Sequence, residues 1–219
     1  MSLHADALAA LEAWAAPDAA QEALRVRYVA HLRAHPDGLE RGCRPDHLTA
    51  STLVLDHDRA HVLLTLHAKA QEWFQLGGHC EPGDTTLAGA ARREATEESG
   101  LGDLSLDPVP VELSEHPVPF CGPRDGVLVH HLDVRFVAVA APGAQVAVSE
   151  ESLDLRWWPV DALPSGPDGR PDPDIAALVA RALHRAGPSG RSDQAGQSTP
   201  SALPSAGGST RAAADQPSR

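Results

Sequence analysis

The chain has 219 residues, 42% of them hydrophobic, which is enough apolar material for one packed domain of ordinary size plus additional segments. Its formal net charge of −12 excludes a broad nucleic-acid-binding surface, and no run of about 18 apolar residues is present to form a transmembrane helix. The three cysteines are odd in number and widely spaced, and the N-terminus does not resemble a signal peptide. We therefore expect a soluble cytoplasmic protein without disulfides, nucleic-acid partners or membrane contacts.

Residues 1–46 are predicted to form a helical N-terminal extension. Ala20, Leu24, Tyr28 and Leu32 recur every four positions, which predicts an amphipathic helix over residues 17–35. Pro17 fits the first turn of this helix, and Pro36 fits its end. A second, shorter helix is expected over residues 6–14.

Residues 47–186 show the pattern of a domain with both strands and helices. Apolar and β-branched runs predict strands, and periodic segments predict helices. In chain order we expect strands at 49–56, 61–67 and 72–75, a helix at 87–98, strands at 128–139 and 155–160, and a helix at 173–186. The first two strands should form a hairpin across the turn-prone sequence HDRA. The expected fold class is α+β, with a mixed sheet packed between helices.

Residues 187–219 differ in composition from the rest of the chain. Ser, Gly, Pro, Ala and Gln dominate, and large apolar side chains nearly vanish. Such a segment buries too little apolar surface to offset the entropy lost on ordering, so we expect a disordered tail.

The informative segment is GGHCEPGDTTLAGAARREATEESGL, residues 77–101. On the predicted helix, Glu94, Glu97 and Glu98 share one side because they are three and four positions apart. Like charges at these spacings destabilise a helix, so a nearby cation is expected. Arg93 lies four positions before Glu97 and can pair with it, and Mg²⁺ prefers such carboxylate oxygens together with substrate phosphates.

The loop before this helix is also suited to phosphate binding. Its glycines, including Gly78, allow backbone conformations closed to other residues, and Pro82-Gly83 indicates a tight turn. Asp84 or Thr85 is expected to cap the helix. Backbone amides exposed at such a loop can contact phosphate oxygens.

The segment of residues 77–101 resembles the signature of the Nudix hydrolase superfamily. Residues 93–101 match the second half of the family signature without a gap, and Gly78, five residues and Asp84 match the first half. Asp84 stands where the family has Glu, and eight residues rather than seven separate it from Arg93. We place the extra residue in the loop around residues 85–87. The later sequence RWWPVDAL is also similar to the family's Trp-containing strand and short helix.

The resemblance implies a divalent-metal-dependent hydrolase of a nucleoside diphosphate linked to another group, with Mg²⁺ or Mn²⁺ as cofactor. Carried over by position, Glu97 and Glu98 bind metal, and Glu94 binds metal or acts as or orients the base. Arg93 orients the glutamates through an ion pair, and Gly78 shapes the loop. The partner is a small-molecule diphosphate. The oligomeric state stays open, although homodimers are common among similar proteins.

Weaker candidates lie inside and outside the signature. A further base or ligand often comes from outside the signature in this family, and Glu150 and Glu151 are the best candidates here, although a surface loop is the simpler interpretation. His79 can contact phosphate or metal, or serve only the loop. Arg135 can meet substrate phosphates or pair within the sheet. Of the adjacent His130 and His131, at most one faces the site, because neighbouring strand residues point to opposite faces.

Two alternatives to hydrolysis stay open. Isopentenyl diphosphate isomerases have a similar Gly-His loop, but their cysteine precedes that pair, whereas Cys80 follows it here. A regulatory Nudix domain would bind nucleotide without turnover, but such domains usually carry a DNA-binding segment and a degraded signature. The residues that select the substrate lie outside the signature, so its identity stays open.

Overall fold

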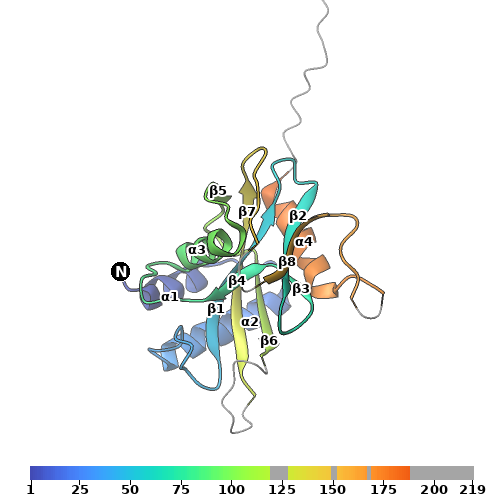
Figure 1. Cartoon of the computed structure of the whole chain (residues 1–219). Coiled ribbons are helices and arrows are strands. Elements are labelled where there is room, and N and C mark those ends of the chain that lie inside the picture. Colours follow the sequence, from blue (N-terminus) through green and yellow to red (C-terminus); the bar gives the residue numbers. More distant parts are fainter. Residues whose placement is uncertain (119–127, 149–151, 167–168, 188–219) are drawn as a thin grey trace, which may run out of the picture.

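The computed structural model describes residues 1–118, 128–148, 152–166 and 169–187, which form one mixed sheet with helices on both faces (Figure 1). The helices are α1 (Leu3–Ala13), α2 (Ala19–Ala34), α3 (Leu87–Ser99) and α4 (Pro173–Ala186). The strands are β1 (His47–Leu55), β2 (His61–His67), β3 (Trp73–Phe74), β4 (Leu76–His79), β5 (Leu104–Leu106), β6 (Glu112–Pro117), β7 (His130–Ala140) and β8 (Ser152–Pro159). The predicted α+β class is confirmed. The tail predicted after residue 187 lies outside the described residues.

Strand β1 is the centre of the sheet. It pairs in antiparallel orientation with β2, as the predicted hairpin requires, and with β4 near its other end. Along its full length it pairs in parallel with β7, from His47 opposite His131 to Leu55 opposite Val139. This one parallel pairing among antiparallel ones makes the sheet mixed, and it aligns residues that are 84 positions apart in sequence.

The two faces of the sheet are covered by different helices (Figure 1). Leu48 and Ala50 of β1 pack in a cluster with side chains of α1, α2 and α3. Leu53 and Leu55 point to the opposite face, where they pack against α4. The signature helix α3 and the C-terminal helix α4 therefore lie on opposite faces. None of the helices in the described part of the chain is both long and apolar enough to span a bilayer.

The N-terminal helices share the core of the domain instead of standing apart from it. Tyr28 and Leu32 of α2 are fully buried, as the periodic pattern predicts, but Ala20 is exposed and Gln21 is buried in its place. The Gln21 side chain donates to the carbonyl of Leu113 at 2.9 Å and accepts from its N–H at 2.7 Å. Gln21 thus continues the hydrogen bonding of β6 beyond the sheet, a role that a search for apolar positions overlooks.

Strands β4, β5 and β6 were not among the predicted strands. The Gly-Gly segment expected to be a loop is the extended strand β4, because it pairs with residues 49–52 of β1. Gly77 permits this pairing, since a Cβ there would collide with the Cα and Cβ of Ser51. Strands β5 and β6 are short, and each is held by antiparallel pairing with β7. Pairing partners distant in sequence, not local propensity, create all three strands.

Candidate functional site

The signature segment folds as strand β4, a tight turn and helix α3. Thr86 caps the helix, its side chain accepting from the N–H of Gly89 at 2.9 Å, and Gly100 ends it in the left-handed conformation with φ 73°. The predicted stop at Gly100 is confirmed, whereas the predicted cap at Asp84 or Thr85 is wrong by one or two residues. The cap shifts because the Asp84 carboxylate instead accepts from the N–H of Glu81 and binds Arg93.

The three signature glutamates are three and four positions apart on α3, and two of them contact the glycines of β4. One carboxylate oxygen of Glu98 accepts from the N–H of Gly77 at 2.9 Å. The Glu94 carboxylate lies against Gly78, where a Cβ would approach its Cδ and Oε2 to 2.8 Å. Glu97 is more exposed, with 57% of its side chain accessible. Gly78 therefore leaves the space that the Glu94 carboxylate fills.

Arg93 connects most of the charged groups of the site. Its guanidinium donates to both carboxylate oxygens of Asp84, at 3.1 and 2.9 Å, and to Glu94 and Glu97, each at 3.0 Å. A further bond at 3.0 Å reaches the backbone carbonyl of His79. Asp84 thus contacts the signature arginine despite the shorter side chain and the extra residue between them. One cation fixes two of the three signature glutamates relative to the strand.

Burial and Arg93 shift the pKa values of the two carboxyl groups nearest the arginine in opposite directions. Burial raises the pKa of Glu94, and Arg93 only partly opposes this, because Glu97 adds repulsion. Burial also acts to raise the pKa of Asp84, but its bonds to Arg93 and the Glu81 amide outweigh burial and hold that pKa below its usual value. The hydrogen bond to Asp84 is the main reason that the pKa of Arg93 is raised. Arg93 therefore stabilises the ionised form of Asp84 enough to outweigh burial, whereas for Glu94 burial outweighs the bond to Arg93.

The donor set fits a hard divalent cation. Glu94, Glu97 and Glu98 offer carboxylate oxygens from one helical side, which are ligands that Mg²⁺ and Mn²⁺ favour. The exposed Glu97 leaves the group open to a ligand that brings phosphate oxygens of its own. Glu94 and Glu97 are joined through Arg93, and Glu98 is bonded to Gly77 of β4.

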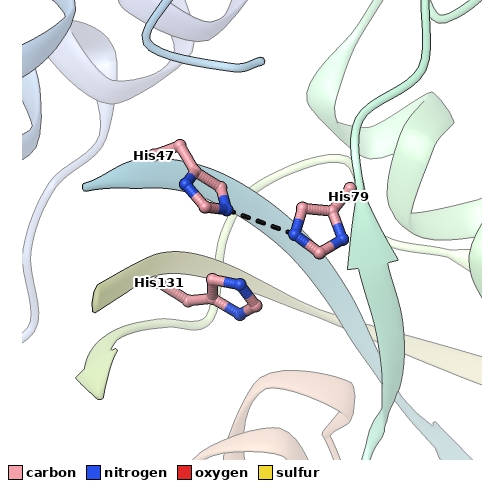
Figure 2. Close-up of side chains that lie close together, drawn as sticks. All are labelled: His47, His79 and His131. Carbon is pink, nitrogen blue, oxygen red and sulfur yellow. Dashed lines mark hydrogen bonds between the residues drawn. The ribbon is translucent and has the colours of Figure 1, made fainter. Parts of the chain in front are cut away.

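The remaining candidates lie elsewhere. His79 points to the face of the sheet opposite α3, beside His47 and His131 (Figure 2). His130 points away from them and bonds to Asp46. His131 was a candidate from the sequence, whereas His47 was not, because no motif lies beside it.

Arg135 belongs to a buried ion-pair network. Its side chain is 3% exposed and bonds to Glu112 at 2.8 Å, Asp133 at 3.3 Å and Asp174 at 2.7 Å. These carboxylates are the partners that a mid-strand charge requires. They explain why the Arg135 guanidinium is buried without invoking a substrate phosphate. Glu150 and Glu151 lie outside the described residues.

Cys80 is unsuited to nucleophilic or acid–base work at neutral pH. Burial raises the pKa of its thiol to about 12, with the Asp84 carboxylate adding to the effect. A thiol must ionise to attack, so this environment keeps Cys80 inert.

Comparison with known proteins identifies the domain family. The family description "NUDIX domain" matches residues 45–179. A solved hydrolase of the NUDIX family from Clostridium perfringens has 24% sequence identity and a TM-score of 0.52, covering 64% of this chain and 98% of that chain. A MutT NUDIX hydrolase from Burkholderia pseudomallei has 17% identity and a TM-score of 0.45, covering 64% of this chain and 100% of that chain. Among curated proteins, no significant sequence match was found.

The chain belongs to the Nudix family, as its signature segment predicts. A hydrolase of this family shares the fold.

Proposed function

We propose that the protein is a divalent-metal-dependent pyrophosphohydrolase that cleaves the diphosphate bond of a nucleoside diphosphate linked to another group. The observation that carries this proposal is the placement of Glu94 and Glu98 against the glycines of β4, with Arg93 bonded to Glu94 and to Glu97. A chain with a net charge of −12 needs such a cation site to accept an anionic substrate.

Each residue has a distinct part in this proposal. Glu97 and Glu98 supply carboxylate ligands to Mg²⁺ or Mn²⁺, and Glu94 is either a third ligand or the group that accepts the proton of the attacking water. Arg93 holds Glu94 and Glu97 in position through its 3.0 Å bonds. The bound metal would neutralise diphosphate oxygens and make phosphorus more susceptible to water.

A product-release assay tests the proposal. Purified protein is incubated with nucleoside triphosphates, ADP-ribose, dinucleotides, nucleotide sugars and non-nucleotide diphosphates, each with Mg²⁺, Mn²⁺ or EDTA. We expect one class to be cleaved with metal, and EDTA to stop the reaction. Binding of a nucleotide without turnover under every metal condition would replace the proposal with a regulatory role. Isomerised product without phosphate release would replace it with isomerase activity.

Gly78→Ala should lower metal-dependent turnover by about 10- to 100-fold, because the new methyl group displaces the Glu94 carboxylate. Folding should change little, since the atoms it meets are the far end of a flexible side chain. Gly83→Ala in the same loop is the matched control, because no atom lies within 4 Å of a Cβ there. Steady-state kinetics and thermal melts of both variants check this. Equal turnover in the two would show that the position of Glu94 is not critical.

A further inference from the structure

Three imidazoles from three strands meet on the face of the sheet opposite α3. His47 begins β1, His79 ends β4 and His131 lies near the start of β7. The antiparallel pairing of β4 and the parallel pairing of β7 with β1 bring them together. Figure 2 shows the three rings converging on one space, and one ring nitrogen of each lies within 4.8 Å of those of the other two.

The spacing of the nitrogens matches that of ligands around one ion. The Nε2 atoms of His47 and His79 are 3.1 Å apart and share a hydrogen bond, whose proton a bound ion would displace. Two imidazoles on a tetrahedral zinc ion, with Zn–N bonds of about 2.0–2.1 Å, have nitrogens roughly 3.3 Å apart. The His131 ring stands edge-on to both, with ring centroids 5.0 Å from His47 and 4.9 Å from His79. A small rotation of His131 would complete a three-nitrogen set.

The imidazoles are held in the neutral form that a metal requires. Burial lowers the pKa of His79 to about 4 and that of His131 to about 2, and the neighbouring rings add to both shifts. Burial likewise lowers the pKa of His47. Among the described residues, none lies within hydrogen-bonding distance of the buried Nε2 of His131. When the proton of neutral His131 is on Nδ1, Nε2 carries a lone pair that accepts no hydrogen bond from the described residues.

We propose that His47, His79 and His131 form a second metal site, which binds a borderline transition-metal ion such as Zn²⁺. Imidazole nitrogens favour Zn²⁺ over Mg²⁺, whereas the glutamates of α3 favour the hard cation, so the two sites differ in their preferred ion. Three histidines leave a fourth position open, as in catalytic rather than structural zinc sites. The site does not depend on the proposed hydrolysis.

The two sites are joined through one residue. The side chain of His79 contributes to the histidine site, while its backbone carbonyl accepts from Arg93 of the signature helix at 3.0 Å. An ion on the histidines would tie β4 to β1 and β7 and so steady the strand against which Glu94 and Glu98 rest. We therefore expect this ion to stabilise the fold as well as to bind.

The test uses the full-length protein, freed of metal with EDTA and returned to buffer with excess Mg²⁺ to occupy carboxylate sites. Zn²⁺ retained per chain is measured after dialysis, Co²⁺ binding is followed by visible absorption, and melting temperature is recorded with and without Zn²⁺. The central comparison is His131→Gln against His130→Gln, an adjacent imidazole that points away from the cluster and bonds to Asp46. Glu97→Gln reports on the signature glutamates.

We expect His130→Gln and Glu97→Gln to bind Zn²⁺ as the unaltered protein does. His131→Gln should retain one equivalent of Zn²⁺ fewer per chain, or bind that equivalent at least about tenfold more weakly. The Zn²⁺-dependent rise in melting temperature should disappear only in His131→Gln. Comparing variants in this way also subtracts zinc held elsewhere, for example by His35, Asp37 and Cys43, whose ligand atoms also lie within 4.8 Å of one another.

Three results would overturn the proposal: no zinc retained by the unaltered protein, equal binding by His131→Gln and His130→Gln, or loss of that equivalent in Glu97→Gln. If His131→Gln does not fold, as judged by circular dichroism, His79→Gln takes its place in the same comparison.

Discussion

Glu98→Gln is expected to reduce kcat for diphosphate hydrolysis by at least about 100-fold at a fixed Mg²⁺ concentration, while the protein remains folded. The glutamine keeps an oxygen that can accept from the N–H of Gly77, the bond that Glu98 makes at 2.9 Å, so β4 and α3 stay in register. It removes one of the negative charges that hold the divalent cation. Initial rates over a range of Mg²⁺ and Mn²⁺ concentrations, with the substrate found in the release assay, measure the effect.

The control for this prediction is Glu40→Gln, which removes the same charge from an exposed position before β1. Its kcat and its metal dependence should equal those of the unaltered protein. If Glu98→Gln retains full turnover with an unchanged metal requirement, Glu98 is not a metal ligand, and the carboxylate serves only to hold Gly77. A raised metal requirement with the same limiting kcat would assign Glu98 to metal binding alone.

Local patterns in the sequence predicted local structure well. The signature segment is contiguous, so its helix, its stop at Gly100 and the common side of its three glutamates all follow from spacing. The hairpin of β1 and β2 follows from two apolar runs flanking a short turn. In both cases the interacting residues are close in sequence, and their periodicity carries the information.

Features created by distant pairing could not be predicted in this way. His47 and His131 meet because β1 and β7 are parallel neighbours, and no pattern near either residue specifies that register. Arg135 was a candidate for substrate phosphates because a mid-strand charge needs a partner, and the sequence did not show that its carboxylate partners come from β6, β7 and α4. Gln21 is polar, so a search for apolar stripes misses it, although its hydrogen bonds to Leu113 explain its burial. Each of these residues is specified by partners that only the fold identifies.

Arg135→Met should destabilise the protein by about 3 kcal/mol near neutral pH, because it leaves buried carboxylates without their cation. The side chains of Arg135 and Glu112 are 3% and 5% exposed, so water cannot replace the lost partner. Part of the loss is offset, since Arg181 also binds Glu112 at 2.8 Å, and Thr49 and Ser51 donate to Asp133. Urea unfolding followed by circular dichroism gives the difference in the free energy of unfolding.

The control is Arg156→Met, in which an exposed arginine loses a surface ion pair with Asp154. Its side chain is 57% exposed, and such pairs contribute only about 0–1 kcal/mol. A loss in Arg135→Met no larger than in this control would show that the buried network adds little beyond packing volume.

The pH dependence of Arg135→Met separates lost charge pairing from lost packing. Burial already raises the pKa of Glu112 in the folded protein, and Arg135 opposes that rise, so its removal should raise the pKa further. A carboxyl whose pKa is higher folded than unfolded destabilises the fold as pH rises through that interval, and the penalty vanishes below the unfolded value. The difference between Arg135→Met and the unaltered protein should therefore be largest at pH 7–8 and shrink toward pH 4. A pH-independent difference would instead mean that the guanidinium contributes mainly by filling space between β7 and α4.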